Sequence, residues 1–564
     1  MSPSTRIISV RISDKQRSAR LREFHSQAHD CSPFILAAVV TLQENNAIAL
    51  IDLATGEVIR SFSAGSVDLT GIDAVEDNVI TQTDSQSGRL REPDAVAWIG
   101  TEYFATADEG DLDGGSRTFT IFDVEGNVVY SSASELDDWV VRIGQYPESR
   151  SDAKGSEPET VRYADFGDAG KLLFINAERS NAVFVYDVSN ATQPKFRQVV
   201  PSGGSGPEGV FAIPQRNLLV VANENDSRAD KFRAAVSIFE LQEADHPVFP
   251  TLWSSKDKTG KYIPFSALSG LASVGTTLYS IEDSYFKSSR IFSIDTEQTV
   301  PVIDMAMRIL DSNGKLASAL SAEEADILLN DDATVNLDQE GIDVIGDGKG
   351  FWIVSEGSGT VGDIENPIET PNLLLRLSDK AIIEEVIMLP EEVNSIQARY
   401  GFEGVAVDGD NVVVAFQRAW VNETDPRLGI YNTATSTWKF VMYPLDEPES
   451  QNGGWVGLSD LEALGEGVFL VLERDDQAGL DAAIKRVYSI DLGDFSMEDG
   501  TLVEKTLVRD LIPDFLSYHG QVPEKVEGLT VDGNGNMWVN NDNDGIDDSI
   551  GEQILMNLGP VEGN

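Results

Sequence analysis

The chain has 564 residues, and its content of 41% apolar and 8% aromatic residues excludes a globally disordered protein. Its formal net charge of −52 at pH 7 excludes nucleic acid and anionic membrane surfaces as partners, because no basic stripe could neutralise phosphates. One cysteine and 4 histidines exclude a disulfide framework and a thiolate- or histidine-rich metal site, which leaves oxygen ligands, with calcium first. An acidic, solvated surface, as in proteins from saline surroundings, would also explain the charge.

The first 38 residues differ in composition from everything that follows. Within residues 1–30 the bases outnumber the acids, although the chain as a whole is strongly acidic. The apolar stretch Phe34–Val40 is short and lacks a following small-residue cleavage site, so no signal peptide is visible. We interpret residues 1–38 as a disordered or non-native N-terminus, with a targeting arm as the alternative. No apolar run reaches the roughly 18 residues that a membrane span needs.

Short β-strands are predicted almost throughout the rest of the chain. Ala47–Phe62 alternates apolar and polar residues on both sides of an Ala-Thr-Gly turn, which indicates a β-hairpin. Phe119–Ser132 and Ala182–Val200 repeat this pattern. Helical signals are few. Ser321–Asn330 combines a Ser cap with acids in the first turn, and Met388–Tyr400 predicts a second short helix.

One sequence unit returns about eight times along the chain: an acidic residue, usually followed by Gly or another small residue, opens a short apolar strand. The copies are spaced by about 50 to 70 residues, a range typical of repeats that each build one propeller blade. One copy, Leu268–Val274, has Ser269 in place of the acid. The acidic copies are Pro93–Trp98, Pro158–Tyr163, Pro207–Ile213, Gln339–Ile345, Phe402–Val407, Ser459–Leu464 and Val526–Val531.

This repeat predicts an all-β fold, a β-propeller in two lobes. We expect residues 251–564 to form a C-terminal propeller of about six blades. Residues 39–250 would supply the N-terminal blades, which close a second propeller completely or only in part. The predicted seam between the two lobes is His246–Lys261.

A second acidic position follows the first by about 13 to 19 residues and ends the next strand, with Gln417 in its place in one repeat. Because the innermost strands of all blades point the same way, residues at one fixed place in each blade form a ring at one end of the channel. Two acids per blade predict two stacked rings of carboxylates, whose repulsion bound calcium would relieve. The alternative is that these acids cap backbone N–H groups or join neighbouring blades and hold no ligand.

A separate calcium signal lies near the C-terminus. The segment Asn540–Asp548 has the spacing of an acidic calcium loop through Asn540, Asp542, Asp544 and Gly545. It lacks the Glu that an EF-hand needs at its twelfth position, so it predicts a looser calcium loop or, alternatively, a plain Asn/Asp turn. Asp108–Gly115 is a weaker relative of this loop.

Several bases stand beside the acidic positions of the repeats. Arg179, Arg418 and Arg474 directly follow the second position in their repeats, and Lys525 lies two residues before Glu527. Guanidinium forks suit phosphate oxygens, so these bases predict an anion clamp. Local charge balancing is the alternative.

The stretches LSGLAS, QEGIDVIGDGKGFWIVSEG, FEGVAV, SDLEALGEGVFLVLERD and KVEGLTVDGNGNMWVNNDND keep a family's order and spacing. Through them, residues from about Ile263 to Leu558 resemble the β-propeller family named for the esterase-like activity of phytase. VTLQENNAIALIDLATGEV, PDAVAWIGTEYFATADEGD, SRTFTIFDVEGNVVYSS and GPEGVFAIPQRNLLVVANE make residues from about Val40 to Glu240 similar to the choice-of-anchor I domain, which is related to atypical alkaline phosphatases. In that family further blades precede the VTLQENNA segment, so we expect the chain to begin part-way through this domain.

Both resemblances imply phosphoester chemistry outside the cytoplasm. They imply an extracellular or periplasmic, monomeric hydrolase that uses Ca²⁺ to cleave a small phosphorylated substrate, a phosphomonoester. Arg418, Arg474 and Lys525 would contact the phosphoryl group. The acids that would hold calcium are Glu340, Glu356, Glu403, Asp460, Glu473, Glu527, Asp542 and Asp544. Two alternatives stay open: a non-catalytic, calcium-stabilised propeller that binds an extracellular partner, and a lactonase- or esterase-like propeller that cleaves carboxyl esters.

Overall fold

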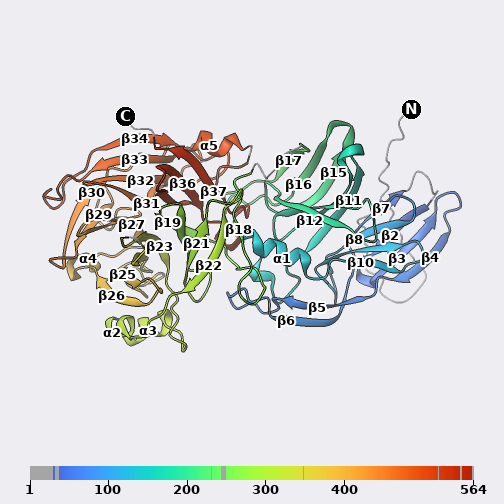
Figure 1. Ribbon diagram of the computed structural model, residues 1–564, viewed down its shortest axis with the longest axis horizontal. Helices are drawn as coiled ribbons and strands as arrows, with labels where there is room; N and C mark the ends of the chain where they lie inside the picture. The colour runs from blue at the N-terminus through green and yellow to red at the C-terminus, as the bar shows by residue number, and fades with distance from the viewer. Residues whose placement is uncertain are drawn as a thin grey trace. The chain divides into compact units, whose positions relative to one another are not determined.

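The computed structural model describes residues 29–31, 37–229, 231–242, 249–346, 348–518, 520–546 and 549–561 (Figure 1). The chain divides into two compact units, Met1–Glu243 with Ile546–Glu552, and Ala244–Gly545 with Gln553–Asn564. Both consist of small, mostly antiparallel β-sheets, which confirms the predicted all-β propeller fold. Most of the N-terminal stretch 1–38 lies outside the described residues.

Five sheets build the C-terminal unit, and each is one blade. Their strands are β19 (Leu268–Val274), β20 (Thr277–Glu282), β21 (Arg290–Asp295) and β22 (Val302–Arg308), with β18 (Trp253–Ser254) parallel to β22; β23 (Gln339–Val344), β24 (Gly350–Ser355), β25 (Leu373–Ser378) and β26 (Ile383–Met388); β27 (Phe402–Asp408), β28 (Asn411–Phe416), β29 (Arg427–Asn432) and β30 (Thr437–Met442); β31 (Val456–Gly465), β32 (Val468–Asp475), β33 (Lys485–Asp491) and β34 (Lys505–Asp510); and β35 (Val526–Val531), β36 (Asn536–Asn541) and β37 (Leu555–Pro560).

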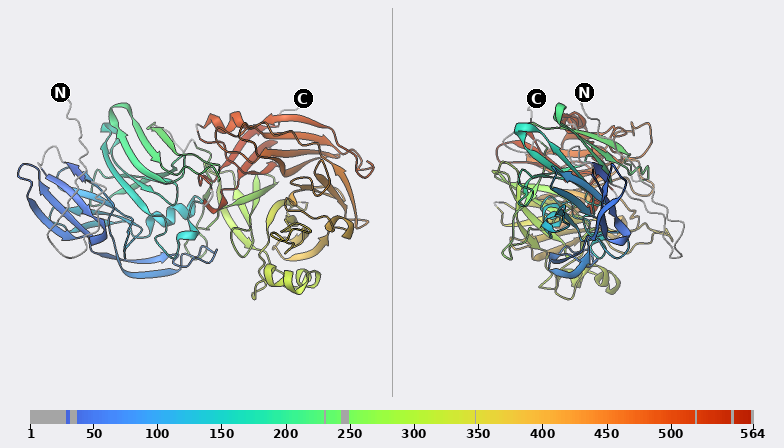
Figure 2. Two further views of the ribbon diagram at one scale, coloured as in Figure 1. Left: turned by 180° about the vertical axis from the view of Figure 1, so that it is seen from behind. Right: turned by 90° about the vertical axis from the view of Figure 1, so that its right-hand side faces the viewer.

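The innermost strands of these blades close a ring. Strand β19 contacts β23, and the contacts continue through β27 and β31 to β35, which returns to β19. Figures 1 and 2 show the five sheets arranged around this ring. The described residues therefore form a propeller of five blades, one fewer than the expected number of about six. The reason is that each blade is opened by one copy of the repeat, and this unit has five copies.

Four blades of the N-terminal unit follow one another along an arc. Their innermost strands β1, β7, β11 and β15 contact in that order, and no comparable contact joins β15 to β1 in the described residues. This is the incomplete form of the predicted second propeller. The strands are β1 (His29–Cys31), β2 (Ala37–Leu42), β3 (Ala47–Asp52) and β4 (Val58–Ser63); β7 (Ala95–Ile99), β8 (Tyr103–Asp108), β9 (Thr118–Asp123) and β10 (Val128–Ser131); β11 (Pro158–Asp165), β12 (Lys171–Ala177), β13 (Ala182–Asp187) and β14 (Lys195–Pro201); and β15 (Pro207–Ile213), β16 (Leu218–Asn223) and β17 (Ala235–Glu240), with the ribbon β5 (Ser66–Ile72) and β6 (Asp84–Leu90) between the first two blades in sequence.

The last blade of the arc has an open face. Phe211 on β15 is in register with Ile238 on β17 through the strand between them, and Phe211, Val236 and Ile238 are 47%, 66% and 65% exposed. Equivalent faces of the preceding blades are buried against the next sheet, because propeller blades pack face to face.

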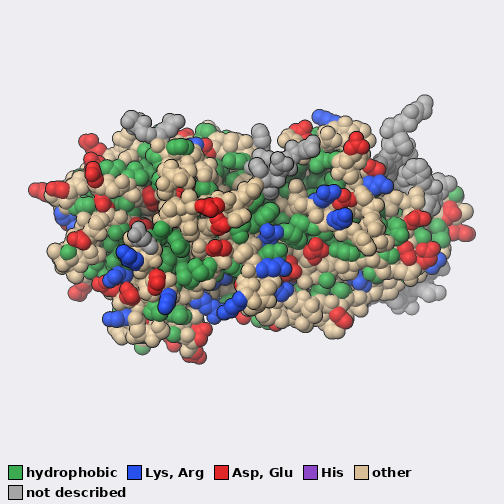
Figure 3. All heavy atoms as spheres, in the orientation of Figure 1, with side chains coloured by type: hydrophobic (Ala, Val, Ile, Leu, Met, Phe, Trp, Pro, Cys, Tyr) green, Lys and Arg blue, Asp and Glu red, His purple; other side chains and the backbone are tan. Residues whose placement is uncertain are grey.

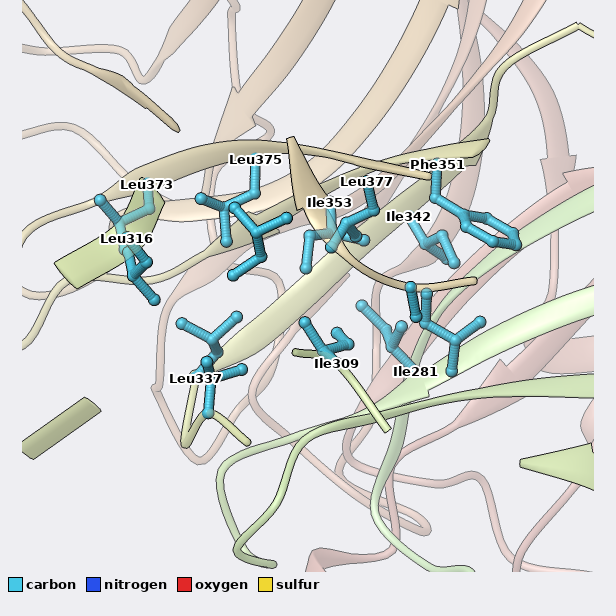
Figure 4. Packing of buried hydrophobic residues seen from close by; sticks show 14 of the residues in the cluster. Ile281, Ile309, Leu316, Leu337, Ile342, Phe351, Ile353, Leu373, Leu375 and Leu377 are labelled. Carbon is cyan, nitrogen blue, oxygen red and sulfur yellow. The ribbon is translucent and has the colours of Figure 1, made fainter. Parts of the chain in front are cut away.

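Apolar layers between neighbouring blades hold the C-terminal ring together. In Figure 4, Ile281 of one blade lies beside Ile342, Phe351 and Ile353 of the next, and all are at most 2% exposed. Complete burial of such a side chain contributes about 1.5–3 kcal/mol. The short helices α2 (Lys315–Ala319) and α3 (Ala322–Leu328) stand outside the ring of strands and extend this layer through Leu316 and Leu328 (Figures 1 and 2).

The predicted helix at Ser321–Asn330 is confirmed by α3. The Ser321 hydroxyl accepts a hydrogen bond from the backbone N–H of Glu324, and the Glu324 carboxylate accepts one from the backbone N–H of Ser321. The second predicted helix is only the single turn α4 (Glu391–Asn394). The other helices are α1 (Glu135–Arg142) and α5 (Ile512–Ser517).

The described helices include none that is long and apolar enough to cross a membrane. On the face in Figure 3, acidic and basic side chains are interspersed, and no single-sign patch dominates the view.

Candidate functional site

A β-bulge places the first acid of each repeat in the channel. The pairing of each innermost strand with the second strand of its blade shifts register after its opening residues, and the bulged residues are Ser269, Glu340, Glu403, Ser459 and Glu527. A bulge leaves its extra residue outside the ladder and re-aims its side chain. On the second strand of each blade, one residue pairs with the residue that precedes the bulge. The next residue along that second strand belongs to a second ring, which consists of Asp283, Glu356, Gln417, Arg474 and Asp542.

The glycine after the acid is explained by how closely the innermost strands approach. A Cβ atom on Gly341 would lie 2.4 Å from the backbone oxygen of Glu403, and one on Gly404 would lie 2.6 Å from the Cα of Asp460. On Gly270 it would lie 2.8 Å from the backbone oxygen of Glu340. No real Cβ atom fits at these distances. The glycine in the repeat therefore lets neighbouring innermost strands pack closely enough to close the ring, while the acid before it supplies the ring's carboxylate.

Five carboxylates gather at one end of the channel. Oxygen atoms of Asp283, Asp338 and Glu340 lie within 4.8 Å of one another, and so do oxygen atoms of Glu340, Glu356 and Glu403. Glu340 belongs to both groups, so the five acids form one continuous set, which we call the acid cluster. Its members come from three consecutive blades.

Burial and mutual repulsion make the acid cluster hard to ionise. Burial raises the pKa of Glu356 to about 7, although the Gly401 N–H donates to its carboxylate. Burial and then Glu403 raise the pKa of Glu340 well above its usual value, and burial and then Glu527 do so for Glu403. Carboxylates that close together need protons or a bound cation.

An internal cation occupies the second ring in the fourth blade. The Arg474 guanidinium donates to the carboxylate of Glu527 and, at 3.1 Å, to the Ser459 hydroxyl. Both partners of this ion pair are almost fully buried, at 3% and 4% exposure. Ser459 and Arg474 occupy the two ring positions of the fourth blade, whereas every other blade of this unit has an acid in at least one of them. The channel mouth therefore has an acidic side and a cationic side.

Arg418 lies at the same mouth in an aromatic setting. Its guanidinium stands 4.6 Å from the ring centre of Tyr400 and 5.0 Å from that of Trp455. Trp455 also faces Arg474, at 5.2 Å. Gln417, directly before Arg418, donates to the Glu403 carboxylate at 2.5 Å. Arg418 is therefore adjacent to the acid cluster and is ion-paired with none of the described carboxylates.

Lys525 occupies the predicted calcium loop. Its ammonium donates to Asp542 at 2.9 Å and to Asp544, so an internal cation already neutralises these carboxylates. The neighbouring Asp542 contributes, after burial, to a raised Asp544 pKa of about 8. Asp542 also accepts from the Asp544 N–H at 2.7 Å, as in an Asn/Asp turn.

Besides Glu527, Asp542 and Asp544, two more predicted ligands lie outside the acid cluster. Asp460 occupies the place that Gly341 and Gly404 hold in their strands, and its carboxylate accepts from the backbone N–H groups of Leu271, Leu461 and Leu529. Glu473 lies one residue before the second-ring position and therefore points to the other face of its strand. There it accepts from Lys505 at 2.6 Å and from the Tyr443 hydroxyl at 2.9 Å. The structure gives both acids partners of their own.

Asp283 and Asp338 belong to the acid cluster, although the sequence reasoning did not include them. In the segment Ser280–Tyr285 (SIEDSY) two acids are adjacent, and only the strand register decides which of them faces the channel. The other, Glu282, pairs with Arg290 at 2.6 Å. Asp338 directly precedes β23. In the fifth blade the residue directly before the innermost strand β35 is Lys525. No repeat signal marks Asp338.

Three buried polar atoms at or beside these rings have no hydrogen-bond partner among the described residues. They are Oε2 of Glu527, Nη1 of Arg474 and Oδ1 of Asn540. Buried polar atoms are rarely left unpaired, so each marks a place where a ligand or an ion can bind.

The N-terminal arc repeats the same bulged arrangement. Its ring acids form two groups whose oxygens lie within 4.8 Å, namely Asp94, Glu109 and Glu159, and Glu178, Glu208 and Glu224. Lys154 binds Glu109, and Arg179 lies 3.3 Å from Glu178 and 3.6 Å from Glu157. In the loop Asp108–Gly115, three backbone N–H groups donate to Glu92, so this loop is organised around a carboxylate.

Comparisons with solved structures give low similarity. PorZ, described as a surface component of the type-IX secretion system of Porphyromonas gingivalis, is 12% identical over 92% of this chain and 60% of its own, with a TM-score of 0.26. The Kuenenia stuttgartiensis hydrazine synthase is 15% identical over 72% of this chain and 97% of its own, with a TM-score of 0.24. The chain thus spans 60% of the length of PorZ. These scores support no statement about activity. No curated protein matches the chain.

Family models match both units. Residues 35–114 and 113–191 match the choice-of-anchor I domain. Residues 263–545, half of the chain, match the model described as esterase-like activity of phytase. This second match covers the innermost strands of all five blades, and with them the acid cluster and Arg474. The chain therefore belongs to the phytase-like family with esterase-like activity of phytase.

Proposed function

We propose that the C-terminal propeller is a calcium-dependent hydrolase of phosphomonoesters. The observation that carries the proposal is the acid cluster beside an arginine that has no carboxylate partner among the described residues. The cluster attracts a cation, and Arg418 attracts an anion. A phosphate ester needs both kinds of contact, because its transition state carries charge on several oxygens.

The residues present fit calcium. Calcium takes six to eight oxygen ligands, and the acid cluster offers carboxylate oxygens in two sets of three that share Glu340. The unpaired Glu527 Oε2 in the first ring and Asn540 Oδ1 beside it are further oxygen donors. When bound, the ion would offset the carboxylates and polarise a phosphoryl group. Asp283, Asp338, Glu340, Glu356 and Glu403 are the residues that would hold it.

The chain's own groups have distinct tasks in this proposal. Arg418 binds the phosphate, and its stacking between Tyr400 and Trp455 holds the guanidinium in place. Arg474 pairs with Glu527 and provides positive charge beside the acid cluster. Glu356 is one of the acids that would hold calcium, and the Gly401 N–H that donates to its carboxylate fixes its orientation. Gln417 orients Glu403.

The direct test is an assay of the full chain with p-nitrophenyl phosphate, phytate and p-nitrophenyl acetate, with calcium or with EGTA. We expect calcium-dependent turnover of the phosphate esters. Glu403→Gln should lower this turnover by about 100-fold or more, in the range for loss of a catalytic group. Glu385→Gln is the matched control, because Glu385 is exposed on the outer strand β26. Phosphatase activity that survives EGTA would refute the mechanism.

The same assay separates the remaining alternatives. Turnover of the acetate ester alone would identify a carboxyl esterase. Calcium-dependent stabilisation without any turnover would identify a binding propeller. The match to the choice-of-anchor I domain supports a surface or extracellular location, which fractionation of the native host would test.

A further inference from the structure

Two arginines at the channel mouth contact aromatic rings, although carboxylates are abundant in this chain. The chain has 94 acidic and 42 basic side chains, yet neither Arg399 nor Arg418 is ion-paired with any described carboxylate. Both stand over Tyr400, at 4.7 Å and 4.6 Å from its ring centre. A guanidinium that stacks on a ring keeps its N–H donors free for an anion at the ring's edge.

These arginines are tied to the acid cluster by short backbone connections. Gly401, directly after Tyr400, donates its N–H to Glu356. Its carbonyl accepts from the N–H of Gln417, whose side chain donates to Glu403. An anion on Arg418 therefore lies next to the cluster and not on a remote surface.

Exposed aliphatic residues lie on two segments that are hydrogen-bonded to the segment of this tyrosine. Val361 is 44% exposed, and the segment that bears it is joined to the Tyr400 segment because the Arg399 N–H donates to the Thr360 hydroxyl at 3.1 Å. Val421 is 43% exposed and follows Trp420, whose indole N–H donates to the Tyr400 carbonyl at 3.2 Å. Ile364, on the same loop as Val361, is 95% exposed.

We propose that this mouth surface, formed by Arg399, Tyr400, Arg418, Trp455, Val361 and Val421, selects phosphomonoesters of apolar alcohols over those of sugars and polyols. The phosphate would bind Arg418, and the alkyl or aryl group would cover the tyrosine and the two valines. This substrate class rests on the proposed hydrolase function. The physical reason is that a ligand with a charged head and an apolar body satisfies the free guanidinium and removes the exposed aliphatic groups from water.

The test is calorimetric binding of ethyl, butyl, hexyl and octyl phosphate to the full chain with calcium, below their micelle concentrations. Each methylene that becomes buried should tighten binding by about fourfold. Val361→Ser with Val421→Ser should flatten this increase and leave ethyl phosphate unchanged. Arg418→Met should weaken the whole series about equally. Leu502→Ser, at an exposed leucine in the β33–β34 loop at the other end of the blade, is the control and should change nothing.

Affinity that does not depend on chain length would overturn the proposal, and so would glycerol phosphate that binds as tightly as hexyl phosphate. Failure of the hydrolase function is distinguishable, because chain-length-dependent binding without turnover would refute only that function. Turnover of ethyl and octyl phosphate with the same kcat/KM would instead support the hydrolase and refute the apolar selectivity.

Discussion

Replacing Arg474 by methionine should strongly destabilise the C-terminal propeller when calcium is absent. Arg474 and Glu527 form a buried ion pair, and Glu403 is a further negative neighbour of the guanidinium. Removing one partner of such a pair leaves an uncompensated buried charge, which costs about 3–5 kcal/mol. We therefore expect Arg474→Met to lower the free energy of unfolding by that amount in EGTA at pH 8, measured by urea denaturation.

The second half of this experiment removes the charge that would be left unpaired. Glu527→Gln in the Arg474→Met background should recover most of the loss, because neither residue then carries a charge. Calcium should also recover part of it by supplying positive charge to the same rings. A loss below about 1 kcal/mol in EGTA would refute the reasoning, since a buried pair of this kind cannot be removed so cheaply. A double variant no more stable than Arg474→Met would refute it as well.

Three further perturbations test the structure. Gly341→Ala should lower the free energy of unfolding by about 1–3 kcal/mol through overpacking against Glu403. The control Gly209→Ala, whose Cβ would lie 3.4 Å from Ala222, should cost less than about 1 kcal/mol. Equal costs of the two variants in thermal unfolding would contradict the close approach of the strands. Burial raises the pKa of Asp343 to about 7, so the folded protein retains a proton that the unfolded chain loses near pH 4, and stability falls as pH rises from about 4 to 7. Asp343→Asn should shrink the stability difference between pH 5 and pH 8 by about 1–3 kcal/mol, and an unchanged pH profile would count against this ionisation. Lys525→Met should leave Asp542 and Asp544 without their cation and create a need for calcium at this loop, seen as a larger calcium-induced rise in Tm than the parent chain shows; no larger rise would indicate that Lys525 is not their main counter-charge.

The repeat alone was sufficient to predict the fold and the ring of acids. Period-2 strands, the spacing of the repeat and the pairing of acid with glycine are local properties of the sequence, and the glycine is required wherever one innermost strand packs on the next. The number of blades in the C-terminal unit also follows from the count of repeats, once the copies on either side of the seam are separated. The expected number of about six blades was one too high because the sequence does not show which copies belong to which unit.

Which acids face the channel could not be predicted in the same way, because a shift of one residue turns a side chain to the opposite face of its strand. In SDLEAL the acid was aligned with Glu340 and Glu403, but the bulge in β31 places Ser459 there and gives Asp460 the position of a glycine. In VLERDD the same shift exchanges Glu473 for Arg474. A bulge leaves no mark in hydrophobic periodicity, so only the register reveals it.

These two exchanges have a consequence for the site as a whole. With Asp460 and Glu473 in the rings, the fourth blade would add two more carboxylates, and all five blades would contribute acids to the rings. With Ser459 and Arg474 there, the same blade contributes a hydroxyl and a guanidinium, and it is the one described blade of this unit without a ring carboxylate. A uniform acidic ring would repel any anion, with about 3 kcal/mol for each unit-charge pair near 5 Å at an effective dielectric constant of 20. A ring that is acidic on one side and cationic on the other can accept a cation and an anion side by side, which is the arrangement that a phosphate ester requires.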